Sequence, residues 1–594
     1  MIKIAKHHAE QMEKAKDLMD GGPLTDPGFA RSLFFGRLRL DKLIPYPTQD
    51  ADEAARTNEM IARLEHVLDT HVDPDLIDAQ EAIPQRAISE LGKIGAMGMT
   101  VPREYGGGGL SHTAYCRVLE RVARTCASTA VFLGAHQSIG LKAVVLNGTE
   151  QQKRRWLPEL AAGRQIAAFA LTEPEAGSDA ANVQTRARIS DDGETWILDG
   201  QKKFITNGAQ AGMMTVMART AIEDNGKTRD KITAFIVTPD MPGFEVVHKN
   251  HSKCGIRGTW QATLRFTQMR VPRQNILGEP GRGLKVALTV LDYGRCTLSA
   301  GCLGGAKVAL DLSVEHVLNR RQFGRTLAEF ELTKQKIARM AELTFAMDAL
   351  TYLCAGLVDR HERDLMLETA ICKLFCSEAS WHVIDDAVQL FGGEGYMREK
   401  GLERMLRDAR INRIVEGATE VMTSFVALMG MKGVGEQFEQ VIHDLRHPIG
   451  NFGRLTSFAG HEWRDVVIGP RVSGLHPRLA AEGRTLARLT RRLARSVSKT
   501  LAVHRQRILD QQMLQQRVAW SVIEMVAMAA VISRLQAMLE SANGDGSDRT
   551  VERDLIVGRG YCRHAAGRIR RRLRGLAVNG DEQRLRVADA VLGM

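Results

Sequence analysis

The chain has 594 residues, of which 44% are hydrophobic and 25% charged, as in an ordinary soluble globular protein with three or four domains. No run of 18 uncharged apolar residues indicates a transmembrane helix. The net charge of +11 arises in residues 431–594, where 27 Lys and Arg stand against 16 Asp and Glu, so the preceding residues are neutral.

Residues 1–50 are predicted to form an N-terminal arm, marked by Pro23, Pro27, Pro45 and Pro47. The first twenty residues mix both charges and lack an apolar core, which argues against a secretory signal. Their acidic residues also argue against a mitochondrial presequence. We therefore expect a cytoplasmic protein.

The nine cysteines form no CxxC pair, and the closest two, Cys372 and Cys376, are one helical turn apart. This spacing predicts reduced, mostly buried thiols and no metal site.

Four further segments differ in texture. Residues 51–165 show helical periodicity, and residues 166–280 contain short β-rich stretches separated by Gly, Pro, Asn and Asp, typical of an antiparallel β-domain. Long helical patterns return in residues 281–430, and a basic helical extension covers residues 431–594.

Four short motifs carry candidate binding groups. LTEPEAGSDA (171–180) ends a strand in a turn whose Thr172, Ser178 and backbone N–H groups suit a polar or anionic ligand. KKFITNG (202–208) places an aromatic residue and a threonine at a strand end. RRQFG (320–324) suits a phosphate and a planar ring, and QLFGGEGYM (389–397) is a glycine-rich helix end that permits close backbone approach. Each motif alone is compatible with plain structure.

A fifth motif, RDARINRIVEGATE (407–420), isolates the carboxylate of Glu416. Ile411, Ile414 and Val415 fall three and four apart, which predicts a buried helix face, and Gly417 then interrupts the helix. A carboxylate withdrawn from water is a stronger base, which suits general-base catalysis near neutral pH. The alternative is a glutamate that caps the helix end or pairs with Arg413.

Taken together, the five motifs resemble the flavin-dependent acyl-CoA dehydrogenase family over roughly residues 55–430. FGRLRLDKLIPYP (35–47), LGAHQSIG (133–140), HPIG (447–450) and LHP (475–477) resemble its very-long-chain branch. The resemblance implies a mainly α fold with a central β-domain: an N-terminal helical domain, a middle antiparallel β-domain, a C-terminal four-helix bundle and an appended helical domain.

The resemblance also assigns residues to ligands. Glu416 matches the catalytic base. Flavin contacts fall on Phe169, Leu171, Thr172, Ser178, Phe204, Ile205, Thr206, Thr419 and Glu420. The adenine end of FAD, held across a homodimer interface, falls on Arg320, Gln322, Phe323, Gln389, Leu390, Gly392 and Gly393. The acyl-CoA falls on Ser178, Asp292, Arg295, Val415 and Gly417, although Asp292 and Arg295 would otherwise be an ordinary helical ion pair.

In the family's mechanism the base removes a proton from Cα of the acyl thioester, and hydride leaves Cβ for the flavin. The backbone N–H of Glu416 and a flavin hydroxyl stabilise the developing charge on the thioester oxygen. An electron-transfer flavoprotein is the expected partner for reoxidation.

One position departs from the family's pattern, and one helix leaves the length of the acyl chain undecided. The family usually has threonine directly after Glu-Gly, where this chain has Ala418, so a hydroxyl contact to flavin is lost or Thr419 replaces it. Val131 and Phe132 are bulky for a deep long-chain tunnel, whereas Ala130 and Gly134 are compatible with one, so medium- or branched-chain acyl-CoA is the alternative substrate.

The basic extension contains an amphipathic helix whose apolar residues are Leu486, Leu489, Leu493, Val497 and Leu501. We expect this stripe to pack on the protein, with arginines facing solvent. Phe452, Phe458 and Trp463, together with the basic run RIRRRLRGL (568–576), predict peripheral contact with the inner face of a membrane. A nucleic-acid-binding relative of the family is a weaker alternative, because aromatics interleaved with the basic residues for base stacking are absent, so only phosphate contact would be supported. A non-catalytic flavin-binding scaffold is also conceivable, but retention of Glu416 argues against it.

Overall fold

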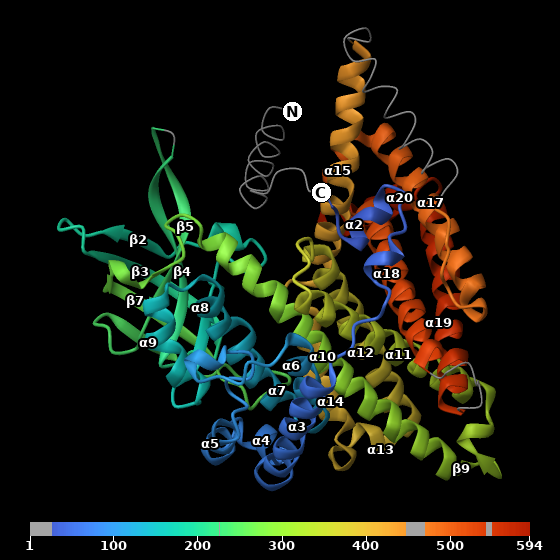
Figure 1. Cartoon of the computed structure of the whole chain (residues 1–594), viewed down its shortest axis with the longest axis horizontal. Coiled ribbons are helices and arrows are strands. Elements are labelled where there is room, and N and C mark those ends of the chain that lie inside the picture. Colours follow the sequence, from blue (N-terminus) through green and yellow to red (C-terminus); the bar gives the residue numbers. More distant parts are fainter. Residues whose placement is uncertain (1–25, 225, 447–469, 542–548) are drawn as a thin grey trace. The chain divides into compact units, whose positions relative to one another are not determined.

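The computed structural model describes residues 26–224, 226–446, 470–541 and 549–594 (Figure 1). The chain forms two compact units, and neither is continuous in sequence. The described part of the first consists of residues 49–312 and 387–416, and the second begins at Asp26 and takes up residues 313–386 and the chain from Gly417 onward.

The first unit opens with helices that pack around one apolar core, to which Met60, Leu64 and Leu68 contribute. Side-chain caps define where several begin: Asp50 accepts from the N–H of Glu53, and Thr149 forms a capping box with Gln152. The helices are α3 (Ala51–His71), α4 (Pro74–Gln80), α5 (Gln85–Lys93), η2 (Arg103–Tyr105), α6 (His112–Thr125), α7 (Ala127–Gly134), η3 (Ala135–Leu141), α8 (Lys142–Asn147) and α9 (Glu150–Ala161).

The run α7–η3–α8 contains an irregularity: η3 is a π-helical segment. Its length and hydropathy would suit a membrane span, but 72% of its most apolar window is buried inside the protein. π-helical turns are frequent at functional sites. The segment therefore belongs to the interior and is a candidate wall for a ligand.

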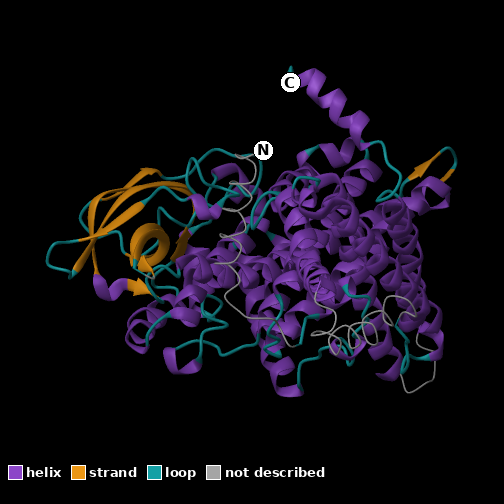
Figure 2. Ribbon diagram, turned by 90° about the horizontal axis from the view of Figure 1, so that it is seen from above, coloured by secondary structure: helices purple, strands orange, loops and turns teal. Residues whose placement is uncertain are grey.

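A β-sheet follows, drawn in orange in Figure 2. Its strand order is β6-β7-β3-β2-β4-β5-β8, with β1 beside β4. Its strands are β1 (Ala167–Ala170), β2 (Arg186–Ile189), β3 (Thr195–Thr206), β4 (Met213–Asp224), β5 (Lys227–Val237), β6 (Phe244–His248), β7 (Gln261–Pro272) and β8 (Ile276–Leu277), with short helices η4 (Ala180–Asn182) and η5 (Arg273–Asn275). Most neighbours are antiparallel, as predicted, and β1 and β2 add two parallel pairings with β4.

Long helices then carry the chain through both units. They are α10 (Gly283–Asn319), α11 (Glu331–Asp359), α12 (Met366–Phe391) and α15 (Thr419–Arg446). Between α12 and α15 lie α13 (Gly393–Tyr396), η7 (Arg398–Lys400), α14 (Leu402–Arg410) and η8 (Ile411–Arg413). A hairpin of β9 (Arg321–Gln322) and β10 (Arg325–Thr326), followed by η6 (Leu327–Glu329), joins α10 to α11 (Figure 1).

The second unit gathers α2 (Phe29–Phe34) and η1 (Leu40–Lys42) with the C-terminal extension. The extension consists of η9 (Pro477–Leu479), α17 (Ala480–His504), η10 (Arg505–Leu509), α18 (Gln512–Ser541), α19 (Arg549–Arg574) and α20 (Asp581–Leu592). α18 packs on α11, α15, α17 and α19. It is apolar enough to span a membrane, but 89% of its most apolar window is buried, so it is a core helix of the second unit.

The amphipathic helix of the extension is confirmed as α17. Leu486, Leu489, Leu493 and Val497 are buried, and Leu501 is half-buried. Arg484, Arg488 and Arg495 are exposed to solvent. The predicted packing of the apolar stripe on the protein is therefore confirmed. HPIG and the aromatic residues Phe452, Phe458 and Trp463 lie outside the described residues.

Candidate active site

Glu416 lies in an irregular turn between α14 and α15. The α-helix ends at Arg410, the 3-10 turn η8 follows, and Glu416 itself has a left-handed backbone with φ +56°. The prediction of a helix face buried through Ile414 and Val415 is wrong, because the helix stops before them, and these side chains are 51% and 39% exposed. A left-handed glutamate costs of order 1–3 kcal/mol and persists only where its surroundings impose it.

The carboxylate of Glu416 rests against the backbone of α10. A Cβ built on Gly294 would lie 3.0 Å from Oε1 and 3.1 Å from Oε2 of Glu416, and 3.0 Å from Cγ2 of Ile139 on η3. Oε2 is withdrawn from solvent, and the residue as a whole is half-buried. The glycine thus leaves the space that the carboxylate occupies.

The chain after Glu416 is held in the second unit. Gly417 has φ +98°, and a Cβ there would lie 2.5 Å from the sulfur of Met422. Nζ of the buried Lys373 donates to the carbonyl of Gly417 at 2.6 Å. The hydroxyl of Thr419 donates to Oε1 of Glu378 at 2.8 Å, so the hydroxyl nearest to Ala418 already has a protein acceptor.

Two of the motifs lie side by side at the ends of β1 and β3. The N–H of Lys203 donates to the carbonyl of Thr172 at 2.9 Å, and Nζ of Lys202 donates to the carbonyl of Leu171 at 3.2 Å. Both strands belong to the same sheet. The turn of the first motif is therefore fixed against the strand of the second.

A buried ion pair provides much of this fixation. Nζ of Lys202 lies 2.7 Å from Oε1 of Glu173, and both side chains are almost fully buried. The carboxylate also accepts from the N–H groups of Gln184 and Thr185. Burial lowers the pKa of Lys202 to about 8; burial alone would raise that of Glu173, but Lys202 and these donors lower it. The ionised pair joins the two sides of the 171–185 turn to β3.

Phe204 is turned outward by a β-bulge. Lys202 pairs with Leu264 and Ile205 with Ala262, so β3 contains one more residue than β7 across this interval. Phe204 takes φ +60° and is 53% exposed, while Ile205 points into the core and is 2% exposed. This strained, half-exposed aromatic follows Lys203, whose N–H is bonded to the half-buried Thr172, and the strand end is therefore a surface suited to a planar ligand.

The remaining predicted residues of this unit take several positions. The side chain of Phe169 is 8% exposed in the core, so this residue, like Ile205, offers a ligand chiefly backbone atoms. Oγ1 of Thr206 accepts from Nε2 of Gln261 at 3.2 Å. On α10, Nη1 of Arg295 donates to Oδ1 of Asp292 at 2.8 Å, which is the ordinary helical ion pair considered above.

The glycine-rich motif and the RRQFG motif lie in different units. Gln389, Gly392 and Gly393 are exposed and Leu390 is half-buried, at the end of α12 in the first unit. Arg320 and Gln322 are exposed in the second unit, and Phe323, with φ +52°, is 93% exposed in the hairpin. Glu420, in the first turn of α15, is exposed.

Three family models decide what these motifs belong to. They are described as the acyl-CoA dehydrogenase N-terminal, middle and C-terminal domains, and they match residues 55–164, 168–269 and 281–429. The chain belongs to the acyl-CoA dehydrogenase family. A fourth model, described as the ACAD9/ACADV C-terminal domain, matches residues 477–592.

Known acyl-CoA dehydrogenases are similar over most of the chain. The very long-chain specific mitochondrial enzyme of Mus musculus is 37% identical over 565 residues, which cover 94% of this chain and 85% of the mouse protein. The structure of acyl-CoA dehydrogenase complexed with FAD from Bacillus anthracis matches with a TM-score of 0.75 at 26% identity over 94% of both chains. Butyryl-CoA dehydrogenase from Megasphaera elsdenii matches with a TM-score of 0.59 at 34% identity, covering 64% of this chain and 98% of its own.

These findings confirm the predicted family, the likeness to its very long-chain members and the fold class. They also confirm the enzyme class, a flavin-dependent oxidoreductase whose cofactor is FAD. The candidate site also includes residues to which the sequence assigned no role, namely Gly294, Ile139, Glu173 and Lys202. Glu173 and Lys202 stand inside the quoted motifs, so an acid and a lysine beside strand ends were a usable signal.

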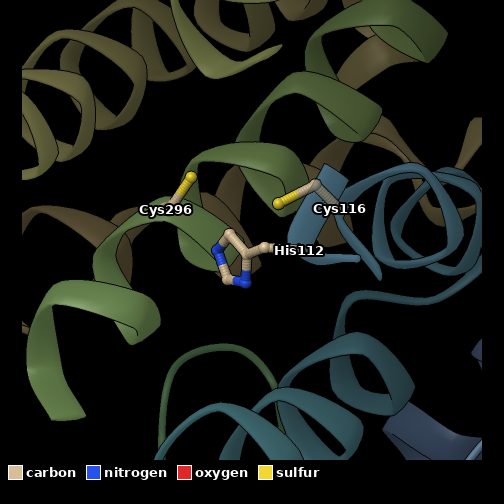
Figure 3. A group of neighbouring side chains, drawn as sticks. All are labelled: His112, Cys116 and Cys296. Atoms are coloured by element: carbon tan, nitrogen blue, oxygen red, sulfur yellow. The ribbon is translucent and has the colours of Figure 1, made fainter. Parts of the chain in front are cut away.

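A buried cluster near the base was not predicted either. Ligand atoms of His112, Cys116 and Cys296 lie within 4.8 Å of one another, between α6 and α10 (Figure 3). Burial lowers the pKa of His112 to about 3, and the charge of Lys142 lowers it further. The same lysine stacks on the ring of Tyr293, which contacts His112. A neighbouring ammonium opposes a metal cation, so we assign this cluster to the core.

Proposed function

We propose that the enzyme oxidises long- or very-long-chain acyl-CoA to trans-2-enoyl-CoA, with Glu416 as the base that removes the Cα proton. The observation that carries this proposal is the placement of the Glu416 carboxylate, which is withdrawn from bulk water and seated on the bare backbone of Gly294. A carboxylate in such a place is spared part of its hydration, and α10 and η3 limit its movement.

The residues present fit the flavin that the family uses. The outward ring of Phe204, the hydroxyl of Thr172 and the exposed turn at Ser178 offer an aromatic face and hydrogen-bonding groups. We call these three the flavin wall. Bound there, the flavin would accept the hydride from Cβ. The protein's own part is to fix this wall through Lys202 and Glu173, to withdraw Glu416 from water and to hold the Cα proton within its reach.

The helices α7 and η3, near Gly294, bear on the length of the acyl chain. The ring of Phe132 is buried in the helical core of the first unit, so its bulk is accommodated there, and Val131, Gly134 and Ile139 are only half-buried. This arrangement, with the likeness to the mouse enzyme, supports a long acyl tail.

One observation favours a medium- or branched-chain substrate as the second candidate. Oγ1 of Thr297, one turn beyond Gly294, lies 2.8 Å from Oγ of Ser138, which lies 3.0 Å from the hydroxyl of Tyr115. These hydroxyls are buried. A long saturated tail gains no hydrophobic contact from such a polar row.

The test is anaerobic bleaching of the bound flavin by palmitoyl-, octanoyl- and branched acyl-CoA. We expect palmitoyl-CoA to reduce the parent enzyme fastest and Glu416→Gln to lose at least about 1,000-fold in rate. Glu582→Gln, a substitution of an exposed glutamate on α20, serves as the control and should match the parent. A fully active Glu416→Gln would refute the base assignment, and faster bleaching by octanoyl-CoA would favour the second candidate.

We further propose that the enzyme works as a homodimer that passes electrons to an electron-transfer flavoprotein. The side chain of Phe323, 93% exposed at the tip of a hairpin, is costly to leave in water and supports a covering partner. Light scattering of the FAD-loaded enzyme tests the dimer, and Phe323→Ser should weaken it. Dye reduction that requires added electron-transfer flavoprotein tests the second partner.

Finally, we propose peripheral association with the inner face of an anionic membrane. Exposed arginines on α17 and α19, among them Arg488, Arg495, Arg570 and Arg574, support it. Flotation with vesicles that contain phosphatidylglycerol, compared with vesicles of phosphatidylcholine alone, tests it. Equal flotation with both would contradict an electrostatic contact.

A further inference from the structure

The loop that joins β6 to β7 supports the back of the proposed flavin wall. The carbonyl of Trp260 accepts from the N–H of Asn207 at 2.9 Å, directly after the strand that carries Phe204. The ring of His251 lies edge-on to that of Phe204, with centroids 5.3 Å apart. The position of Phe204 therefore depends on where this loop lies.

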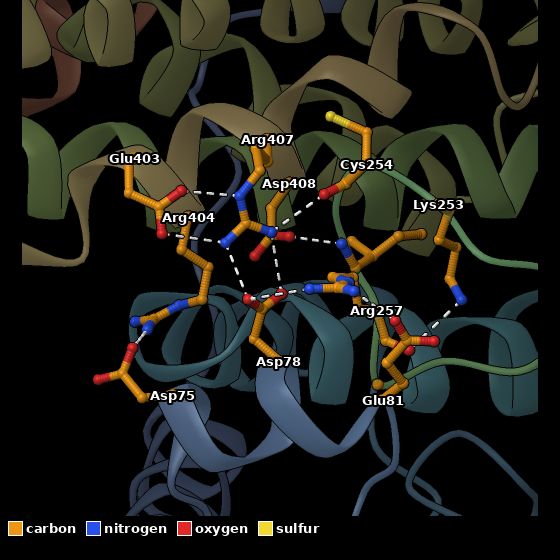
Figure 4. A network of polar contacts seen from close by, with 12 residues as sticks. Asp75, Asp78, Glu81, Lys253, Cys254, Arg257, Glu403, Arg404, Arg407 and Asp408 are labelled. Carbon is orange, nitrogen blue, oxygen red and sulfur yellow. Dashed lines mark hydrogen bonds and ion pairs between the residues drawn. The ribbon is translucent and has the colours of Figure 1, made fainter. Parts of the chain in front are cut away.

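Helix α14 holds the same loop by two consecutive residues (Figure 4). The carboxylate of Asp408 accepts from the N–H of Ile256, and Nη1 of Arg407 donates to the carbonyl of Cys254 at 3.0 Å. Gly255 lies so close to the helix that a Cβ there would overlap the backbone carbonyl of Arg407. Ile256 has φ +46°, a conformation that a β-branched residue adopts only when it is imposed.

An ion-pair network fixes α14 itself (Figure 4). Arg407 donates to Asp78 on α4 at 3.0 and 2.8 Å, which ties α14 to α4, and to Glu403 on its own helix at 2.7 and 3.1 Å. Asp408 is only 8% exposed, and burial, helped by the charge of Asp78, raises its pKa to about 6 although the N–H of Ile256 and the neighbouring arginines act to lower it. Burying a carboxylate costs free energy. The contact of this carboxylate with the N–H of the strained Ile256 indicates that its role is to hold the loop in place.

We propose that Asp408 is a positioning residue for the 251–260 loop. Through this loop it holds Phe204 and Asn207 where a flavin on the wall and the carboxylate of Glu416 can both reach the acyl thioester. The chain reaches Glu416 eight residues after Asp408, by way of the end of α14 at Arg410 and the turn η8, so the same short stretch of chain sets both the base and the support of the flavin wall. This inference rests on the proposed flavin wall.

The experiment uses the full-length enzyme with Asp408→Ala and the milder Asp408→Asn, which keeps an oxygen acceptor. Asp75→Ala is the matched control, because Asp75 pairs with Arg404 across the same α4–α14 contact without touching the loop. Hydrogen exchange of peptides covering 250–262, the affinity of the apoenzyme for FAD and the visible spectrum of the bound flavin are measured besides activity.

For Asp408→Ala we expect faster exchange at 250–262, an altered flavin spectrum and about ten-fold slower flavin reduction at saturating acyl-CoA, with acyl-CoA affinity unchanged. Asp408→Asn should show smaller changes of the same kind, and Asp75→Ala none. Slow exchange and a parental spectrum in both Asp408 variants would overturn the proposal. Phe204→Ala distinguishes failure of this proposal from failure of the proposed flavin wall. Unchanged FAD affinity and an unchanged flavin spectrum in that variant would refute the flavin wall itself.

Discussion

Gly294 offers the sharpest test of how the base is seated. Replacing it with alanine places a methyl carbon 3.0 Å from Oε1 and 3.1 Å from Oε2 of Glu416, and 3.0 Å from Cγ2 of Ile139. Ordinary contacts of a methyl group with oxygen or carbon begin at about 3.4 Å, so the carboxylate must retreat by a few tenths of an ångström. The backbone of α10 is unaffected, because alanine is the better helix former.

The expected effect falls on the rate of proton removal. A displacement of about 1 Å at a reacting group costs about 100-fold in rate, so a few tenths should cost about 3- to 30-fold. Stopped-flow measurement of anaerobic flavin reduction by palmitoyl-CoA gives this rate directly. An increased kinetic isotope effect with the α-deuterated substrate would show that proton removal is the step affected.

Gly301→Ala is the matched control on the same helix, because a Cβ there would meet only Cβ of Ala123, at 4.0 Å. It should leave the rate unchanged and stabilise the enzyme by about 1 kcal/mol. If Gly294→Ala reduces flavin as fast as Gly301→Ala, the carboxylate of Glu416 does not depend on this glycine and the seating argument fails.

Three further predictions concern stability. Glu416→Gly should be about 1 kcal/mol more stable towards urea than Glu416→Ala, because only glycine adopts φ +56° without strain, and equal stability would contradict an imposed backbone. Lys202→Met should cost about 3 kcal/mol and release FAD, because it leaves the Glu173 carboxylate buried without its cation, whereas Lys153→Met, at a half-buried lysine on α9, should do neither. Burial, with Asp364 nearby, raises the pKa of Glu368 from 4.5 to about 7, so the folded protein keeps a proton there that the unfolded chain loses above about pH 4.5. Its contribution to stability therefore falls as pH rises from about 4.5 to 7, and Glu368→Gln should lose less melting temperature than the parent between pH 5 and pH 8; parallel losses would show that Glu368 titrates normally.

The motifs could be recognised, and Glu416 could be proposed as the base, because their information is local. Short stretches such as LTEPEAGSD and KKFITNG keep their residues together in the chain, and the alternation from helical to β-rich and back is visible in hydrophobic periodicity. The burial of the apolar stripe of α17 followed from the same kind of pattern.

What the sequence did not reveal depends on long-range contacts. The need for glycine at position 294 arises from a carboxylate 122 residues further along the chain, and the Glu173–Lys202 pair joins the turn after β1 to strand β3. Periodicity placed Ile414 and Val415 on a buried face because it assumed a continuous α-helix, whereas the chain leaves that helix at Arg410. No propensity distinguishes these cases, since tertiary contacts decide them.

Because of the extra residue in β3, the outward position of Phe204 in the flavin wall depends on the number of residues in the strand as well as on their identity. In a regular strand the parity of positions 202–206 would turn Phe204 inward and Ile205 outward, and one inserted residue reverses that order. Exchanges of Phe204 for tyrosine or tryptophan thus leave the wall intact, whereas losing a single residue between 202 and 205 would restore the ladder and bury the ring. No side-chain substitution compensates for such a deletion. Among enzymes that share this wall, we therefore expect the number of residues in this interval to be fixed more strictly than their identity.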